Sequence, residues 1–301
     1  MKGITATMTT VTTDDVSTGI TGFIDILGFS KKIECATDIS HINDIRRLIE
    51  KVQSEFDFDT KDELIQEVHQ ISNKSVLAFS DCVVINIPLE SKATEYSGSF
   101  DPFLCELTGF AYAQGTCASD GLFLRGGLDI GWWFQSGTTL ISSSMVGAYK
   151  AETKAVVPVI SVTDDLYTYF ANHKDRKLYA PDYDPIKNCL RKYVNNLGEK
   201  PLEYWYLDYI TICLKDLGWQ TSKKQREKYI SSCAEEKNSI MSDGWKINVD
   251  AWLSNHARKI ETAHNDTDDS KVKLKYKWLS EYHNDVAKDF TDTVSCFCSK
   301  F

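Results

Sequence analysis

Two aspartates stand at positions where a carboxylate has chemical meaning. Asp25 interrupts an apolar run at residues 22–29, GFIDILGF, and Asp81 separates two further apolar runs. An ionised carboxylate is costly to bury without a partner, so we expect Asp25 to face a cation or the end of a sheet. Carboxylates suit hard divalent ions, and two such ions about 3.5 to 4 Å apart activate an attacking oxygen and neutralise phosphate groups. Asp25 and Asp81 are therefore candidate ligands for phosphoryl transfer assisted by two metal ions.

Each aspartate taken alone also has an ordinary structural explanation. An aspartate at a strand end commonly caps a turn or pairs with a surface lysine. The metal hypothesis requires the two carboxylates to converge, which depends on the elements that carry them. The runs at 75–80 and 82–87 have strand composition and meet at Asp81, which predicts a hairpin with this carboxylate at its tip.

Apolar spacing predicts the other elements of the first half of the chain. Helical spacing runs through 39–71, 102–119 and 142–154, and strand-like runs occupy 22–29, 122–134 and 156–162. The resulting order is ferredoxin-like with additions, so the predicted fold class is α+β, an antiparallel sheet with helices on one face. In such a sheet the first strand lies beside the hairpin, which brings Asp25 and Asp81 together.

Changes in composition along the sequence predict three regions. Residues 1–17 are rich in Thr and Asp and are expected to form a flexible leader. Residues 18–165 carry the predicted sheet and form the expected catalytic domain. Residues 166–301 are rich in Tyr, Lys, Asn and Trp at helical spacing, so we expect a helical C-terminal extension that packs on the core or on a partner subunit.

Composition excludes several classes of protein. Among the 301 residues, 42% are hydrophobic and 26% charged, as in ordinary globular proteins. The net charge of −9 repels a phosphate backbone, so no nucleic-acid partner is expected. No run approaches the roughly 18 to 20 apolar residues of a membrane span, and nine cysteines form no CxxC pair. These features favour a cytoplasmic protein with reduced thiols and no membrane association.

Three motifs in order resemble those of class III nucleotidyl cyclases. The run at 23–29 resembles the first metal motif of that family, the segment at 79–81, FSD, stands at its second metal aspartate, and RGGLDIG at 125–131 resembles its later Arg-x-Gly strand. The resemblance covers about residues 20–163. It implies a homodimer in which Asp25 and Asp81 hold two Mn²⁺ or Mg²⁺ ions, with Ile26 binding metal through its backbone carbonyl.

The same resemblance assigns substrate contacts to Phe23, Leu77, Arg125 and Lys150. Leu77 stands where the family presents an adenine-selecting lysine, so recognition of a purine is not expected. The family's asparagine and arginine fall near Val146 and Lys150, where Lys150 would replace the arginine as a point charge. Arg125 is expected either to contact the triphosphate or to fix the sheet edge through an ion pair.

Further segments resemble a divergent subgroup, the bacterial pyrimidine cyclases of the anti-phage system called Pycsar. These segments are GAYKAE at 147–152, VPVI at 157–160 and KWLSEYHN at 277–284. The resemblance implies cyclic UMP made from UTP with release of pyrophosphate, or cyclic CMP from CTP. The product would activate a separate effector protein during phage infection.

Two other functions were weighed. The missing asparagine and arginine suggest a degenerate cyclase fold that serves as a regulatory dimerisation module, although such a module has no need for paired carboxylates. A two-metal phosphodiesterase usually requires histidine-rich ligand sets, and the six histidines are scattered along the chain.

Overall fold

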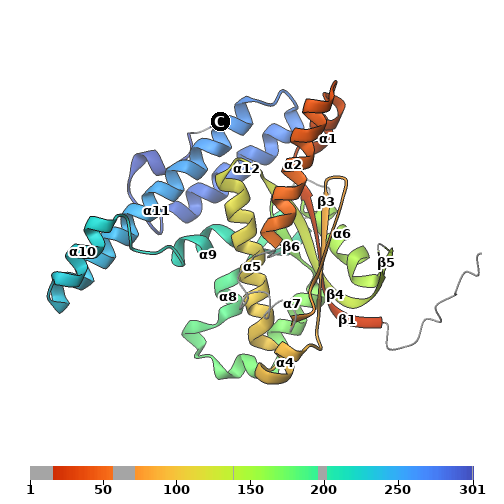
Figure 1. Ribbon diagram of the computed structural model, residues 1–301, viewed down its shortest axis with the longest axis horizontal. Coiled ribbons are helices and arrows are strands. Elements are labelled where there is room, and N and C mark those ends of the chain that lie inside the picture. Colours follow the sequence, from red (N-terminus) through yellow and green to blue (C-terminus); the bar gives the residue numbers. More distant parts are fainter. Residues whose placement is uncertain (1–15, 57–71, 138, 196–201, 300) are drawn as a thin grey trace, which may run out of the picture.

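The computed structural model describes residues 16–56, 72–137, 139–195, 202–299 and 301 (Figure 1). The predicted leader therefore lies outside the described residues except for Val16 and Ser17, which open the first strand. The strands are β1 (Val16–Ile26), β2 (Ser75–Phe79), β3 (Cys82–Pro88), β4 (Leu124–Ser136), β5 (Thr139–Ser142), β6 (Ile160–Val162), β7 (Leu190–Asn195) and β8 (Leu202–Leu207).

Helices alternate with these strands in the first half and dominate the second. The α-helices are α1 (Phe29–Glu34), α2 (Ile39–Phe56), α4 (Lys92–Ser97), α5 (Phe100–Ser119), α6 (Ser143–Ala155), α7 (Asp164–Asn172), α8 (Pro185–Cys189), α9 (Tyr209–Lys215), α10 (Lys223–Ser231), α11 (Ala234–Asn265) and α12 (Ser270–Ala287). Three 3₁₀ turns are η2 (Lys174–Leu178), η3 (Pro181–Tyr183) and η4 (Val294–Cys296). No helix among the described residues is both long enough and apolar enough to cross a membrane.

One sheet joins all the strands, in the order β2-β3-β1-β4-β6-β8-β7, with β5 paired to the far end of β4. β1 lies between β3 and β4 and is antiparallel to both. The order β2-β3-β1-β4 is that of a ferredoxin-like sheet, so the predicted α+β class and the predicted hairpin at Asp81 are confirmed. β4 and β6 are parallel, whereas β6, β8 and β7 are antiparallel neighbours.

Alternation along β1 divides the sheet into two faces. Ile20 and Ile24 belong to the large core that also contains Phe103 and Phe110 of α5, and α2 packs on this face as well. Residues of opposite parity point to the other face, where Phe23 packs with Ala148 of α6. Helices therefore cover both faces, so the prediction of helices on one face only was wrong: α6, which follows β5, packs on the face opposite α5. Figure 1 shows α5 and α6 on either side of the sheet.

Two predicted strands are shorter than their apolar runs. The run at 22–29 leaves the strand after Ile26, because Gly28 has φ +78° and the chain turns there into α1. Left-handed backbone of this kind suits glycine, which has no Cβ. The run at 156–162 forms a strand only from Ile160, since Val156 has φ +65° and Pro158 has no N–H to donate to a ladder.

The region after residue 165 is mainly helical, as expected, but it also extends the sheet. The hairpin of β7 and β8 carries Tyr204 and Tyr206 into the core and pairs with β6. The predicted catalytic domain and the C-terminal region therefore share one sheet. The aromatic run LEYWYL has strand composition, but its helical neighbours favour a helix at the level of sequence alone.

Candidate active site

Strand register brings the first aspartate to a cross-strand row of polar groups. Asp25 lies opposite Cys82 of β3 on one side and opposite Arg125 of β4 on the other. Directly opposed residues of neighbouring strands point to the same face of the sheet. The three side chains therefore share the face that carries α6, at the end of the sheet where β1 leads into α1.

Asp81 reaches the same place from the turn of the β2–β3 hairpin. Ser80 precedes it with φ +53°, which closes a two-residue turn between Phe79 and Cys82. Ligand atoms of Asp25, Asp81 and Cys82 all lie within 4.8 Å of one another. The structure thus brings together the two aspartates that the sequence singled out.

Arg125 supplies the positive charge nearest to Asp25. Its Nε donates to Oδ2 of Asp25 at 2.5 Å and also lies 2.7 Å from Oε1 of Glu152 on α6. The second approach is an ion pair without hydrogen-bond alignment, because Oε1 of Glu152 has no hydrogen-bond partner in the described structure. One guanidinium is therefore shared between two carboxylates that are largely buried.

The electrostatics of the site follow from this burial. Desolvation raises the pKa of Asp25 above its usual range; Arg125 opposes this shift, and the nearby Asp81 carboxylate adds to it. Desolvation likewise raises the pKa of Glu152, and Arg125 again opposes the shift. The site therefore holds more negative charge than one guanidinium compensates, a condition that favours a bound cation.

Cys82 is the third member of the cluster and is a weak ligand candidate. Burial and the Asp81 and Asp25 carboxylates raise the pKa of its thiol to about 12. The protonated thiol donates a weak hydrogen bond, 3.7 Å long, to Oδ1 of Asp81. Only thiolates bind metals well, so the two carboxylates are the stronger candidate ligands, and Cys82 donates to one of them.

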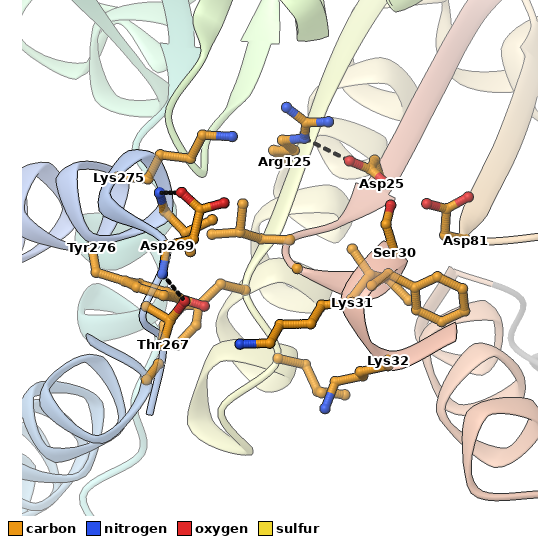
Figure 2. Close-up of a pocket in the computed structure, with 18 of the residues that line it drawn as sticks. Asp25, Ser30, Lys31, Lys32, Asp81, Arg125, Thr267, Asp269, Lys275 and Tyr276 are labelled. Carbon is orange, nitrogen blue, oxygen red and sulfur yellow. Dashed lines mark hydrogen bonds and ion pairs between the residues drawn. The ribbon is translucent and has the colours of Figure 1, made fainter. Parts of the chain in front are cut away.

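A cleft of about 1030 Å³ opens beside the carboxylates (Figure 2). One wall is β1 with α1, another is α6, and the third comes from the turn between α11 and α12 and from α12 itself. Four cationic and six acidic side chains line it: Lys31, Lys32, Arg125 and Lys275, with Asp25, Glu34, Asp81, Glu152, Asp266 and Asp269. Without added cations the cleft is net acidic.

The structure places the predicted substrate residues in different environments. Phe23 and Arg125 line the cleft, as does Ile26, whose backbone role as a metal ligand stays a prediction. Phe23 is only 7% exposed and packs edge to face with Tyr149, with ring centroids 5.4 Å apart.

Leu77 and Lys150 do not line this cleft. Leu77 belongs to a cross-strand row with Val84 and Phe23, two residues along the strands from Asp25 and on the same face of the sheet. Lys150 lines a separate hollow of about 360 Å³ beside Asp129 and Thr163. Their roles as substrate contacts are not explained by this single chain, and they stay predictions.

The sequence predicted three of the ten charged side chains of the cleft, and of the others Glu152 and Lys275 bear most on its electrostatics. Glu152 lies in the segment quoted for the family resemblance, and its place one turn after Ala148, which packs on the sheet, would have indicated burial. Lys275 had no signal, because it stands 250 positions after Asp25 in the chain and only the tertiary fold brings them together.

Among known proteins, solved structures resemble this chain in fold. No protein-family model matches the sequence, and no curated protein does. A bacterial light-regulated adenylyl cyclase aligns over 64% of this chain and 91% of its own, with 14% identity and a TM-score of 0.36. The guanylyl cyclase domain of the RhoGC fusion protein of the aquatic fungus Blastocladiella emersonii aligns over 64% and 96%, with 14% identity and a TM-score of 0.40.

A third similar structure is a class III adenylyl cyclase-like ATP-binding protein from Pseudomonas aeruginosa. It aligns over 56% of this chain and 37% of its own, with 17% identity and a TM-score of 0.35. The similar structures are thus adenylyl and guanylyl cyclases and a protein described as cyclase-like.

Proposed function

We propose that this chain is a nucleotidyl cyclase, which closes a nucleoside triphosphate into its 3′,5′-cyclic monophosphate and releases pyrophosphate. One observation carries the proposal: Asp25 of β1 and Asp81 of the β2–β3 turn present oxygens within 4.8 Å of each other, at a cleft that Arg125 and three lysines also line. Phosphoryl transfer needs metal ions held against the phosphate groups, and two carboxylates this close together at a cleft can hold such ions.

The carboxylate pair fits hard divalent ions. Asp25 and Asp81 offer oxygen donors, the ligands that Mg²⁺ and Mn²⁺ prefer, and Arg125 alone does not balance their charge together with that of Glu152. We propose that these two aspartates hold two Mn²⁺ or Mg²⁺ ions, with the backbone carbonyl of Ile26 as a further donor. When bound, such ions lower the pKa of the ribose 3′-hydroxyl and neutralise the phosphates.

The chain's own residues would bind and orient the substrate. Arg125 is placed to contact phosphate oxygens once a cation has taken over the charge of Asp25, while its pairing with Glu152 keeps the guanidinium in position. Lys31 and Lys32 on α1 contribute positive charge from the wall below the carboxylates (Figure 2). The excess of acidic residues explains why a triphosphate would bind here only together with divalent ions.

A homodimer is the second part of the proposal. Three large apolar side chains are exposed on the face that carries Asp25: Phe79 is 48% exposed, and Val146 and Tyr149 of α6 are each 53% exposed. Exposed apolar groups gathered near a site mark a surface for association. A second copy of the chain covering this face would also bring new side chains to the substrate base.

The base specificity rests on the family resemblance and on Leu77. The row formed by Leu77, Val84 and Phe23 is apolar and offers no side-chain donor to the ring nitrogen of a purine. We propose UTP as the substrate and cyclic UMP as a second messenger of anti-phage defence that activates a separate effector. CTP and cyclic CMP are the alternative.

One competition experiment tests these statements. The purified protein is incubated with equimolar ATP, GTP, CTP and UTP and Mn²⁺, and products are identified by mass spectrometry. Cyclic UMP is expected to dominate, with no product in excess EDTA or with Asp25→Asn. A dominant cyclic AMP or cyclic GMP signal would overturn the pyrimidine assignment. No product from any nucleotide would favour the degenerate dimerisation module.

A further inference from the structure

Lys275 reaches the cleft from the C-terminal region, in a position fixed by helix packing. On α12 the residues Val272, Tyr276 and Leu279 turn toward the core, and the ring of Tyr276 meets that of Phe123 with centroids 5.4 Å apart. The spacing of these anchors sets the rotation of α12 about its axis. Lys275 therefore lies at the edge of the buried stripe, where the helix borders the cleft.

The ammonium of Lys275 has no ion pair or hydrogen bond with any residue that the structure describes, although the side chain is half-buried. Burial lowers its pKa, and the positive charge of Arg125 lowers it further, while Glu152 and Asp25 act in the opposite direction. Figure 2 shows its tip extended toward Arg125 and away from Asp269. Lys275 thus extends toward another cation, and the nearby carboxylates of Glu152, Asp25 and Asp269 act on it only at a distance, without an ion pair.

Such an arrangement is explained by an anion that both cations contact. Arg125 lies beside the carboxylates that would hold the metal ions, and Lys275 lies beyond it on the opposite side from Asp81 (Figure 2). A chain of phosphates that begins at the metal ions and passes Arg125 would bring its terminal groups to Lys275. An ammonium suits this role, because it is a point charge with three donors on a flexible stem.

We propose that Lys275 binds the terminal phosphates of the nucleotide, so that helix α12 is part of the substrate site. The assignment rests on the proposed function for the identity of the substrate, but the anion site is defined by the chain itself. Lys275 is then a binding residue for the pyrophosphate half, and the C-terminal region is needed for substrate affinity as well as for packing.

The test uses the full chain and inorganic tripolyphosphate with Mn²⁺, measured by calorimetry. Lys275→Gln is expected to weaken tripolyphosphate binding roughly tenfold or more, because a charge-assisted contact is lost. Lys275→Arg, which keeps the charge, should restore most of the affinity. The matched control is Lys277→Gln, which removes the same charge from an exposed position of the same helix and should bind as wild type does.

A second readout separates this inference from the proposed function. With the nucleotide that is turned over, Lys275→Gln should raise KM by a factor similar to the loss in tripolyphosphate affinity. If no nucleotide is turned over but Lys275→Gln still weakens tripolyphosphate binding, the cyclase proposal fails and the anion site stands. Equal tripolyphosphate affinity in wild type and Lys275→Gln, with unchanged melting temperatures, would overturn the inference.

Discussion

Nε of Arg125 lies 2.5 Å from Oδ2 of Asp25, so a candidate metal ligand is ion-paired to its neighbour across the sheet. The same nitrogen lies 2.7 Å from Oε1 of Glu152. Asp25 therefore has two possible sources of compensation, the guanidinium and a divalent cation, whereas the guanidinium is the one ion-pair partner of Glu152 among the described residues. Binding of an ion at Asp25 would leave Arg125 to Glu152 and to the substrate.

Replacement of Arg125 by glutamine should destabilise the metal-free protein. The change leaves Asp25 and Glu152 buried without an ion-pair partner, and removing one partner of a buried pair costs about 3 to 5 kcal/mol. Arg125 is 28% exposed, so we expect a smaller loss, about 2 kcal/mol, after solvent screening. Urea unfolding with and without Mn²⁺ measures this loss.

Comparing the free energy of unfolding with and without Mn²⁺ shows whether the stability lost in Arg125→Gln comes from the uncompensated charge of Asp25. Mn²⁺ should recover part of the stability lost in Arg125→Gln, because the ion compensates Asp25. The control is Arg47→Gln, which removes a guanidinium paired with Asp44 on the exposed surface of α2 and should change stability little. Equal unfolding curves for Arg125→Gln and wild type in the absence of metal would refute the shared-guanidinium account.

Asp25→Asn and Asp81→Asn should each abolish cyclisation and weaken Mn²⁺ binding. Asparagine keeps the shape of aspartate but removes the charge that a hard cation requires. Asp81→Asn should melt close to the wild-type temperature, since Asp81 is paired with no cation among the described residues. Product formation and Mn²⁺ titration provide the measurements, with the exposed Asp44→Asn as the control.

Activity above about a tenth of wild type in both aspartate variants would be incompatible with their proposed role as metal ligands. That threshold is lenient, because loss of groups that stabilise a phosphoryl-transfer transition state commonly costs several powers of ten.

The sequence predicted the centre of the fold better than its edges. Apolar spacing is regular in the first half of the chain. It predicts the hairpin at Asp81, the helices α5 and α6, and the order of the ferredoxin-like strands. β7 and β8 were not predicted, because each is a short strand between Lys- and Tyr-rich segments with helical spacing, and its own alternation of side chains is too brief to stand out. The early end of β1 depends on the left-handed conformation of Gly28, which apolar spacing does not encode.

The proximity of Asp25 to Asp81 was predictable, because a ferredoxin-like sheet places the first strand beside the hairpin. Arg125 was expected to contact a triphosphate or to fix a sheet edge through an ion pair. It forms the ion pair, with Asp25, and it also lines the cleft, so its contact with phosphate stays a prediction. Lys275 depends on how α12 packs across the chain, a long-range relationship that no local pattern contains.

Gly127→Ala should loosen the helix that carries Glu152. A Cβ at position 127 would lie 2.0 Å from the carbonyl oxygen of Ala148 and 2.9 Å from the backbone nitrogen of Glu152. α6 would have to shift away from β4, and overpacking of this kind costs about 1 to 3 kcal/mol. Urea unfolding should show this loss.

The control for that substitution is Gly109→Ala on α5. A Cβ at position 109 would meet no atom within 4 Å, and alanine is the better helix former by about 0.5 to 1 kcal/mol. The two glycine-to-alanine changes should therefore shift stability in opposite directions. A neutral Gly127→Ala would show that α6 does not pack on β4 as closely as the structure indicates.

Two buried histidines form a directional chain of hydrogen bonds in the C-terminal region. Nε2 of His283 lies 2.7 Å from the carbonyl oxygen of Cys296, which only accepts, so this nitrogen carries the proton. Nδ1 of His283 then accepts from Nδ1 of His256 at 2.9 Å. Nε2 of His256 in turn accepts from the hydroxyl of Tyr209 at 2.8 Å. Two neutral rings satisfy every contact of this chain.

This pair should make the protein sensitive to mild acid. Burial lowers the pKa of His283 to about 4 and that of His256 well below its ordinary value of 6.5. The unfolded chain takes up protons at both histidines as the pH falls through 6.5, and the folded protein does not, so folding stability falls. Each histidine should contribute about 1.4 kcal/mol per pH unit between about pH 6 and the folded pKa.

His283→Gln isolates this contribution, because glutamine can still donate to the carbonyl of Cys296 but does not titrate. The raised pKa values of Asp25 and Glu152 act in the opposite direction, since these groups bind protons more readily in the folded state, and they are common to both proteins. The variant should be less stable than wild type at pH 7 but lose stability less steeply down to pH 5, by about 1.4 kcal/mol per unit. His41→Gln, on the exposed surface of α2, should keep the wild-type slope. Parallel slopes for wild type and His283→Gln in urea unfolding at pH 7, 6 and 5 would show that His283 is not held neutral by its burial.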